Sequence, residues 1–174
     1  ELAQEFKVDN ISNSPSKFDM DQLLYWQKKA VEELNVSECI SWLKDSLAGL
    51  PSSIDKDNFV ALIKDNINFP HEAQEYLNYL FLTPLKERSE IINIIRSAGK
   101  DFFLKAQEVV APGISDWNET VKTIGSETGN KGKELFMPLR CAITGQTKGP
   151  ELDRVVSLIG TEEVVRKLKE AAEL

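Results

Sequence analysis

Apolar residues recur every three or four positions along almost the whole chain, the spacing that places them on one face of an α-helix. Residues 18–34 show the pattern clearly, with Leu23, Leu24 and Val31 behind Asp19, a residue suited to capping a helix start. No segment alternates apolar and polar positions for long enough to indicate a strand. The pattern therefore predicts an all-α fold, a multihelical bundle.

Residues that cap or open helices mark further helix starts in the first half of the chain. Ser37 is a candidate cap for a helix that ends before Pro51. Asp55 or Asp57 starts the next helix, and Pro70 opens another, because proline has no N–H to lose in the first turn. The first half is therefore expected to be helical throughout.

Two expectations concern the beginning of the chain. Residues 1–17 are expected to form a short helix and then a loop rich in Ser and Asn, in which Pro15 prevents a helix. Tyr25 and Trp26 are expected to pack in the core or at its boundary, as large aromatic side chains usually do.

The pair Thr83-Pro84 is the best internal boundary, because a capping residue followed by proline indicates a new helix. It divides the chain into two predicted helical subdomains, residues 1–82 and residues 83–174. Predicted helices of the second part end at Gly99, at Pro112-Gly113 and at Gly129, and Gly160 separates the last two.

Composition indicates an ordinary soluble protein, with 41% hydrophobic and 28% charged residues. No apolar run approaches the roughly 18 residues that a membrane span needs. The chain begins without Met or a signal peptide, so we expect a piece of a longer cytoplasmic protein. Cys39 and Cys141 lie within apolar helical patterns and are expected to be buried free thiols.

Candidate catalytic residues are scarce. The one histidine, His71, follows the proline of a predicted helix start, and no triad or metal cluster can be assembled around it. The chain contains neither of the glycine-rich phosphate-binding motifs, GxxxxGK[ST] and GxGxxG. We therefore expect no catalytic site and no metal or cofactor site in this chain.

Charge is distributed unevenly. The net charge of −7 argues against indiscriminate nucleic-acid binding, yet residues 131–150 carry four cationic side chains against one acidic side chain. We expect Pro138 to open a short helix, Gly145 to end it, and Pro150 to start another. The residues alone are also consistent with an ordinary helical corner whose charge is incidental. The four cationic residues are Lys131, Lys133, Arg140 and Lys148.

The run PLRCAITG, preceded by KGKELFM and followed by GP and LIGTEEVVRKL, resembles the C-terminal anticodon-binding region of bacterial glutamyl-tRNA synthetase. The resemblance is dense over residues 131–174, clear over residues 1–27 and looser between. It implies that the chain recognises a tRNA anticodon. It also implies a parent enzyme, a glutamate–tRNA ligase, that uses ATP and Mg²⁺ to join glutamate to its tRNA at residues outside this chain.

The resemblance assigns roles to individual residues. Arg140 falls on the arginine that contacts the first anticodon base, and Thr144 lies one helical turn away on the same expected approach side. Pro150 and Leu152 fall on positions that wall the pocket for anticodon bases. Gly149 also belongs to this site. At Gly149 and Asp153 the chain departs from members that carry Thr and an aromatic residue, and Lys131, Lys133 and Lys148 are expected to contact phosphates.

The resemblance also indicates a residue for the third anticodon base. In some members an arginine of the N-terminal helical part selects C there, and counting back from the shared Tyr79-Leu80-Phe81 places that position near Asn66. An amide offers both donors and acceptors, so Asn66 predicts weak discrimination. Lys64 lies nearby but is a flexible point charge.

The expected partner is tRNA, through its anticodon loop, with no DNA, no membrane and a monomeric chain. A protein of another class remains an alternative, namely a helical protein-interaction module that docks through a stripe of Leu135, Phe136 and Leu139. RNA affinity that falls steeply with salt would favour the first interpretation, and salt-insensitive binding to a protein would favour the second.

Overall fold

The computed structural model describes residues 18–174, and every regular element in this part of the chain is helical. The predicted all-α fold is thus confirmed, whereas the short helix and loop expected over residues 1–17 lie outside the described residues. No helix in residues 18–174 is both long and apolar enough to cross a membrane. The α-helices are α2 (Met20–Glu33), α3 (Val36–Trp42), α4 (Lys56–Ile63), α5 (Pro70–Leu77), α6 (Ser89–Ala98), α7 (Lys100–Val110), α8 (Trp117–Thr128), α9 (Lys133–Thr144) and α10 (Leu152–Ala172).

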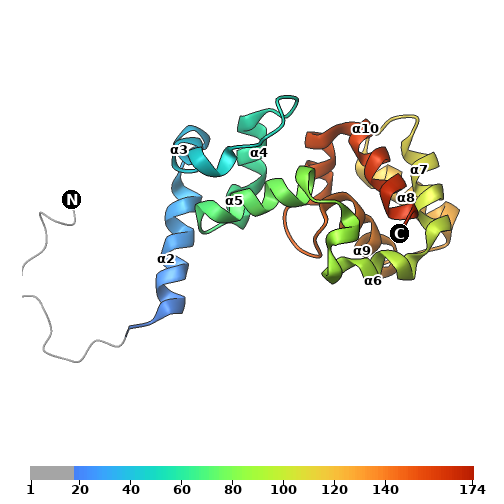
Figure 1. The fold of residues 1–174 in the computed structure, drawn as a ribbon, viewed down its shortest axis with the longest axis horizontal. Helices are drawn as coiled ribbons and strands as arrows, with labels where there is room; N and C mark the ends of the chain where they lie inside the picture. Colours follow the sequence, from blue (N-terminus) through green and yellow to red (C-terminus); the bar gives the residue numbers. More distant parts are fainter. Residues whose placement is uncertain (1–17) are drawn as a thin grey trace, which may run out of the picture.

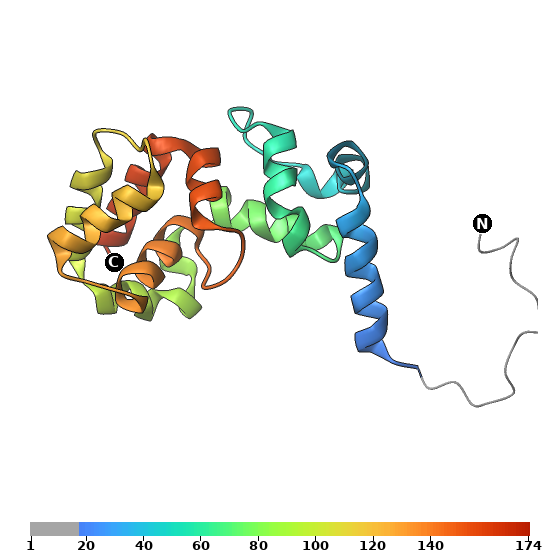
Figure 2. The same ribbon diagram turned by 180° about the vertical axis from the view of Figure 1, so that it is seen from behind.

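The helices form two groups, and the last helix, α10, returns to the side that faces the first group (Figures 1 and 2). Helices α2 to α5 gather on one side, where α3 packs on α4. Helices α6 to α10 gather on the other side, where α10 packs against α7 and α9. A π-helical turn, Asn78–Leu82, continues α5 toward α6, and α4 also contacts α10.

The helix starts predicted at Asp19, Asp55 and Pro70 are confirmed. The Asp19 carboxylate accepts hydrogen bonds from the backbone N–H groups of Asp21 and Gln22 at 3.0 and 3.2 Å, which confirms it as the cap of α2. Asp55 caps α4 by accepting from the N–H of Asn58 at 2.8 Å, and Pro70 is the first residue of α5.

The cap predicted at Ser37 is wrong, because Asn35 holds this position. The Asn35 side chain accepts from the N–H of Glu38 at 2.9 Å, and the Glu38 carboxylate accepts from the N–H of Asn35 at 2.8 Å. This reciprocal pair satisfies two backbone donors that Ser37, two residues further along, cannot reach together.

The helix start predicted at Thr83-Pro84 is also wrong. A single 3₁₀ turn, Leu85–Glu87, follows the proline, and α6 begins only at Ser89. The N–H of Leu85 donates to the Glu170 carboxylate of α10 at 2.6 Å, and Arg88 turns its side chain inward. Contacts with distant parts of the chain therefore decide where this helix begins.

Helix α9 begins at Lys133, so Pro138 lies inside it and does not open it as predicted. Proline at this position removes the N–H that would donate to the carbonyl of Glu134. The side-chain amide of Asn130 donates to that carbonyl at 3.3 Å and partly replaces the missing bond. Helix α10 begins at Leu152, two residues later than the start predicted at Pro150.

The predicted breaks at Gly145 and Gly160 are confirmed, with φ angles of 70° and 79° that favour glycine. Cys39 and Cys141 are buried free thiols, as expected. Burial raises the pKa of the Cys141 thiol to about 11, which keeps it protonated at neutral pH.

The packing predicted for Tyr25 and Trp26 is wrong. Their side chains are 55% and 60% exposed on α2, and their rings meet edge to face with centroids 5.4 Å apart. Helix α2 buries Val31 near its C-terminal end, so only that end joins the core.

Candidate nucleic-acid interface

Residues 145–151 connect α9 to α10 and are called the basic corner below. Residues of α9 bond to the corner near its beginning and near its end. Gly145 adopts a left-handed conformation, and its N–H donates to the carbonyl of Cys141 at 2.9 Å, which ends the helix. At the other end, the Nη1 of Arg140 donates to the carbonyl of Pro150 at 3.0 Å. Arg140 itself is half-buried.

Thr144 lies inside this corner. Its side chain is buried, and its Oγ1 lies 2.8 Å from the carbonyl oxygen of Arg140 and 3.2 Å from that of Gln146. The N–H of Gln146 donates to the same hydroxyl at 3.1 Å. The hydroxyl therefore supports the turn, and the structure does not place it beside Arg140 on an outward face.

A cavity of about 340 Å³ lies against the corner. It joins three predicted site residues, Asn66, Lys148 and Gly149, which come from widely separated parts of the sequence. Asn66 and Lys148 are exposed and Gly149 is partly exposed, so all three are accessible to a ligand. The full lining is Asn66, Tyr76, Tyr79, Glu90, Gly145, Gln146, Thr147, Lys148 and Gly149.

Other predicted residues lie beside this cavity or far from it. Pro150 and Leu152 are buried next to the corner and form part of its support. Lys131 and Lys133 are exposed at the beginning of α9. At 1.5 Å per residue the helix carries them roughly 18 Å from Gly145, so they are not brought to the corner.

Arg88 is a site residue that the sequence analysis missed. Its side chain is only 7% exposed, and its Nη2 donates toward the carbonyl oxygens of Asn78, Tyr79 and Thr83, at 3.0, 2.8 and 2.7 Å. Its Nη1 donates to the carbonyl of Gly145 at 3.3 Å. One side chain therefore ties the end of the π-helical turn to the corner between α9 and α10.

A signal for Arg88 was present in the sequence. Ile91 and Ile95 follow it at spacings of three and seven, so Arg88 extends the buried stripe of α6 by one turn. A cation on an apolar stripe indicates a buried charge that requires acceptors. Burial lowers the pKa of Arg88, which nevertheless stays charged at neutral pH because guanidinium is so basic.

Tyr76 and Tyr79 were also missed as site residues, because aromatic residues at helical spacing usually belong to the core. Both are half-buried and line the cavity. The ring of Tyr79 covers the Arg88 guanidinium, with 4.9 Å between the ring centroid and Cζ. Burial, together with nearby Glu72, raises the pKa of Tyr76, so its hydroxyl stays protonated and can donate.

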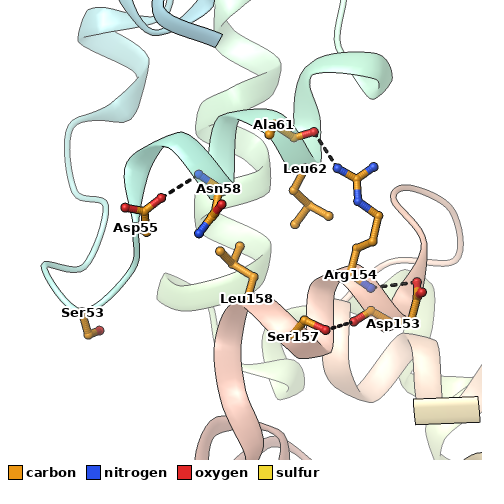
Figure 3. A pocket seen from close by; sticks show the side chains of 9 residues that line it. All are labelled: Ser53, Asp55, Asn58, Ala61, Leu62, Asp153, Arg154, Ser157 and Leu158. Carbon is orange, nitrogen blue, oxygen red and sulfur yellow. Dashed lines mark hydrogen bonds between the residues drawn. The ribbon is translucent and has the colours of Figure 1, made fainter. Parts of the chain in front are cut away.

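A second cavity, of about 460 Å³, lies between α4 and α10 (Figure 3). Arg154 reaches across it, and its Nη2 donates to the carbonyl of Ala61 at 2.9 Å. Asp55 and Ser157, drawn on either side of the gap, bond within their own helices. This cavity contains none of the predicted site residues.

The docking stripe of the alternative interpretation is not present on the surface. Leu135 is 6% exposed and Leu139 is fully buried, so only Phe136, at 54%, faces solvent. No group of three or more His, Cys, Asp or Glu side chains that might hold a metal ion occurs within residues 18–174. His71 is exposed and its ring stacks on that of Phe69, with centroids 5.8 Å apart.

Comparison with known proteins identifies the class to which this helical fold and its basic corner correspond. The chain belongs to the anticodon binding domain family, whose model matches residues 38–172. Among curated relatives it is 38% identical over 174 residues to glutamate–tRNA ligase 1 of Halorhodospira halophila, and 36% identical over 172 residues to glutamate–tRNA ligase 2 of Acidithiobacillus ferrooxidans. The resemblance seen in the sequence is confirmed.

These matches cover 99% and 98% of this chain but only 36% and 35% of the two relatives. The chain therefore spans about a third of the length of the ligases it matches. A crystal structure of glutamate–tRNA synthetase from Elizabethkingia anophelis shares its fold, with a TM-score of 0.75 at 18% identity. That likeness covers 100% of this chain and 36% of the other.

Proposed function

We propose that this chain recognises the anticodon loop of a glutamate tRNA as part of a glutamate–tRNA ligase. The observation that carries the proposal is the cavity that joins Asn66 with Lys148 and Gly149. The parent enzyme uses ATP and Mg²⁺ to attach glutamate to its tRNA at residues outside this chain. It acts in the cytoplasm as a monomer and does not bind DNA.

The geometry suits the recognition of single-stranded RNA. Proteins usually obtain RNA sequence specificity from unstacked loop bases, whose edges are accessible to side chains. The cavity at the corner falls within the range of volumes that hold small ligands, and Arg140, which is not among its lining residues, is tied to the same corner through the carbonyl of Pro150. Exposed Lys148 supplies a phosphate contact at the rim.

The charge distribution supports the same proposal. The chain as a whole is acidic, with a net charge of −7, whereas residues 131–150 carry four cations and one acid. Acidic surfaces repel RNA and a local basic segment attracts it, so contact is confined to the corner and to the beginning of α9, where Lys131 and Lys133 lie. The proposed division into subdomains 1–82 and 83–174 fits this arrangement, because the cavity lining includes Asn66 from the first and Lys148 from the second.

Binding to an anticodon stem-loop of glutamate tRNA tests the proposal. We expect specific binding whose affinity falls steeply with salt, because phosphate contacts release counterions. A stem-loop with the same stem and a permuted anticodon is the matched control and should bind more weakly. Equal affinity for the two loops, or affinity that does not change with salt, would contradict the proposal.

A further inference from the structure

Tyr79 occupies an unusual place in the cavity at the corner. One face of its ring lies over the Arg88 guanidinium, with Cζ 4.9 Å from the ring centroid. The same residue lines the cavity, together with the segment 145–149. Because Arg88 covers one face, the part of Tyr79 that borders the cavity is its edge and its remaining face. An aromatic ring in this position presents a flat apolar surface to whatever enters.

Arg88 fixes this ring relative to the corner. The guanidinium donates to the carbonyl of Tyr79 itself and also to that of Gly145. A Cβ added at Gly145 would lie 1.8 Å from the Nη1 of Arg88, so the corner and the guanidinium are already in close contact. Neither wall of the cavity can shift without displacing a buried charge from its acceptors, which is costly.

Gly149 lines the same cavity and adds no side chain to it. Gly149 has a φ of 131° and lies against Tyr76, since a Cβ there would come within 3.3 Å of the Tyr76 hydroxyl oxygen. Only at Gly145 and Gly149 does the corner contribute no side chain to the cavity. Polar groups stand around it, with Asn66 and Gln146 as amides, Lys148 as the cation and Glu90 as one carboxylate. A flat aromatic surface with amides and a cation beside it is suited to a nucleobase and its phosphate, and the Glu90 carboxylate can accept from an N–H group of the base.

We infer that Tyr79 is a stacking surface for one unpaired base of the bound RNA, and that Arg88 is the positioning residue that holds it. The inference rests on the proposed function and names the surface on which the extruded base is held. Stacking on an aromatic ring does not depend on the identity of the base. Tyr79 therefore supplies affinity, while neighbouring polar groups supply the preference for a particular base.

The chain contains three tyrosines, which makes a direct test possible. In protein labelled with 3-fluorotyrosine, three ¹⁹F signals are expected and can be assigned from Tyr25→Phe, Tyr76→Phe and Tyr79→Phe. On titration with the anticodon stem-loop, the Tyr79 signal should shift strongly because of the ring current of a stacked base. The Tyr25 signal should stay in place, because that residue is exposed on α2.

Affinity provides a second readout. Tyr79→Leu should weaken binding to the stem-loop by roughly tenfold to hundredfold, the usual range for loss of one base–aromatic stack. Tyr79→Phe keeps the ring and should bind as the parent does, and Tyr25→Leu is the control for loss of an exposed ring. Arg88→Lys should give an intermediate loss and a smaller ¹⁹F shift, because lysine cannot bond several carbonyls while lying flat against the ring.

The outcomes separate this inference from the proposed function. If the parent chain does not bind the stem-loop, the proposed function fails. If it binds and the Tyr79 ¹⁹F signal does not move, or if Tyr79→Leu binds with parental affinity, the stacking role is wrong while the proposed function stands. The ¹⁹F titration uses the unsubstituted fold, so it decides the matter even if Tyr79→Leu does not fold.

Discussion

At the scale of single residues, Arg140 has two tasks. It holds the corner through the carbonyl of Pro150, and we propose that its other guanidinium donors read the first anticodon base. We predict that Arg140→Ala weakens binding to the anticodon stem-loop by about 1–3 kcal/mol and relaxes preference at its first base. Lys133→Ala should weaken binding evenly across loops. The affinities of both chains for stem-loops varied at the first base provide the measurement. If Arg140→Ala has the same affinities and the same order of preference as the parent, Arg140 does not read this base.

Lys167 is a residue whose burial lowers stability. It is 4% exposed in α10, and desolvation is the main cause that lowers its pKa to about 8. The charges of Arg166 and Arg88 also lower this pKa, whereas the charge of Glu163 raises it. Between about pH 8 and the usual value of 10.5 the unfolded chain holds a proton that the folded chain has released, so the free energy of unfolding rises with pH there.

We therefore predict that Lys167→Met raises the free energy of unfolding at pH 7 by about 1–3 kcal/mol, since a shift of one pKa unit corresponds to 1.36 kcal/mol. The advantage should shrink as pH rises through 8 and vanish above about 10.5. Urea unfolding of both chains from pH 6 to 11 measures it, with exposed Lys169→Met as the control. A stability difference between the two chains that does not depend on pH would show that the charge of Lys167 does not destabilise the folded chain.

At the scale of elements, two helix ends allow a matched comparison. Gly129 ends α8 with a φ of 76° and Gly145 ends α9 with a φ of 70°. A Cβ at Gly129 meets nothing within 4 Å, whereas a Cβ at Gly145 would collide with Arg88. The two positions therefore share the same backbone preference and differ in whether Arg88 is displaced.

We predict that Gly129→Ala costs about 1 kcal/mol of stability and leaves RNA affinity unchanged. Gly145→Ala should cost at least about 2 kcal/mol more, because the buried guanidinium loses carbonyl acceptors, and it should weaken binding to the stem-loop. Thermal unfolding and stem-loop titration of the two variants measure both effects. Equal losses for the two variants would mean that Arg88 does not fasten the corner.

The elements also explain which parts of the fold could be predicted. Asp19, Asp55 and Pro70 mark helix starts correctly because each acts on backbone groups within three residues. The failures at Pro84 and Pro138 have distant or side-chain causes. Glu170 takes the N–H of Leu85, and Asn130 replaces the bond that a proline removes. Local signals therefore predict a helix start where no distant residue offers a better partner and no neighbouring residue forms a better cap, as Asn35 does at α3.

At the scale of the whole molecule, the site is assembled from parts that no local pattern connects. The basic stretch identified the corner, because a cluster of cations is visible along the sequence. The sequence did not predict that a single helix, α9, separates Lys131 and Lys133 from the corner, because Pro138 was expected to open that helix. Arg88 and Tyr79 could not be assigned to the site, since their role depends on how the π-helical turn meets the corner.

Asn66 reaches the site only through the assembly of the whole chain, and it allows a prediction about selectivity. It is exposed at the cavity, while the nearby Lys64 ammonium is engaged by the carbonyl of Leu34. The amide of Asn66 can donate to one base and accept from another, so it rejects neither strongly. We predict a preference for C at the third anticodon base below roughly 100-fold, or about 2.7 kcal/mol at 1.36 kcal/mol per decade.

Affinities for stem-loops that differ only at this base measure the preference. Asn66→Arg should increase it, because a guanidinium supplies a charged planar fork with donors and no acceptor. Asn66→Ala is the control that removes the amide, and it should lower affinity slightly for both loops. A preference for C above roughly 100-fold in the parent chain would contradict the prediction. If Asn66→Ala keeps that preference, another residue reads this base.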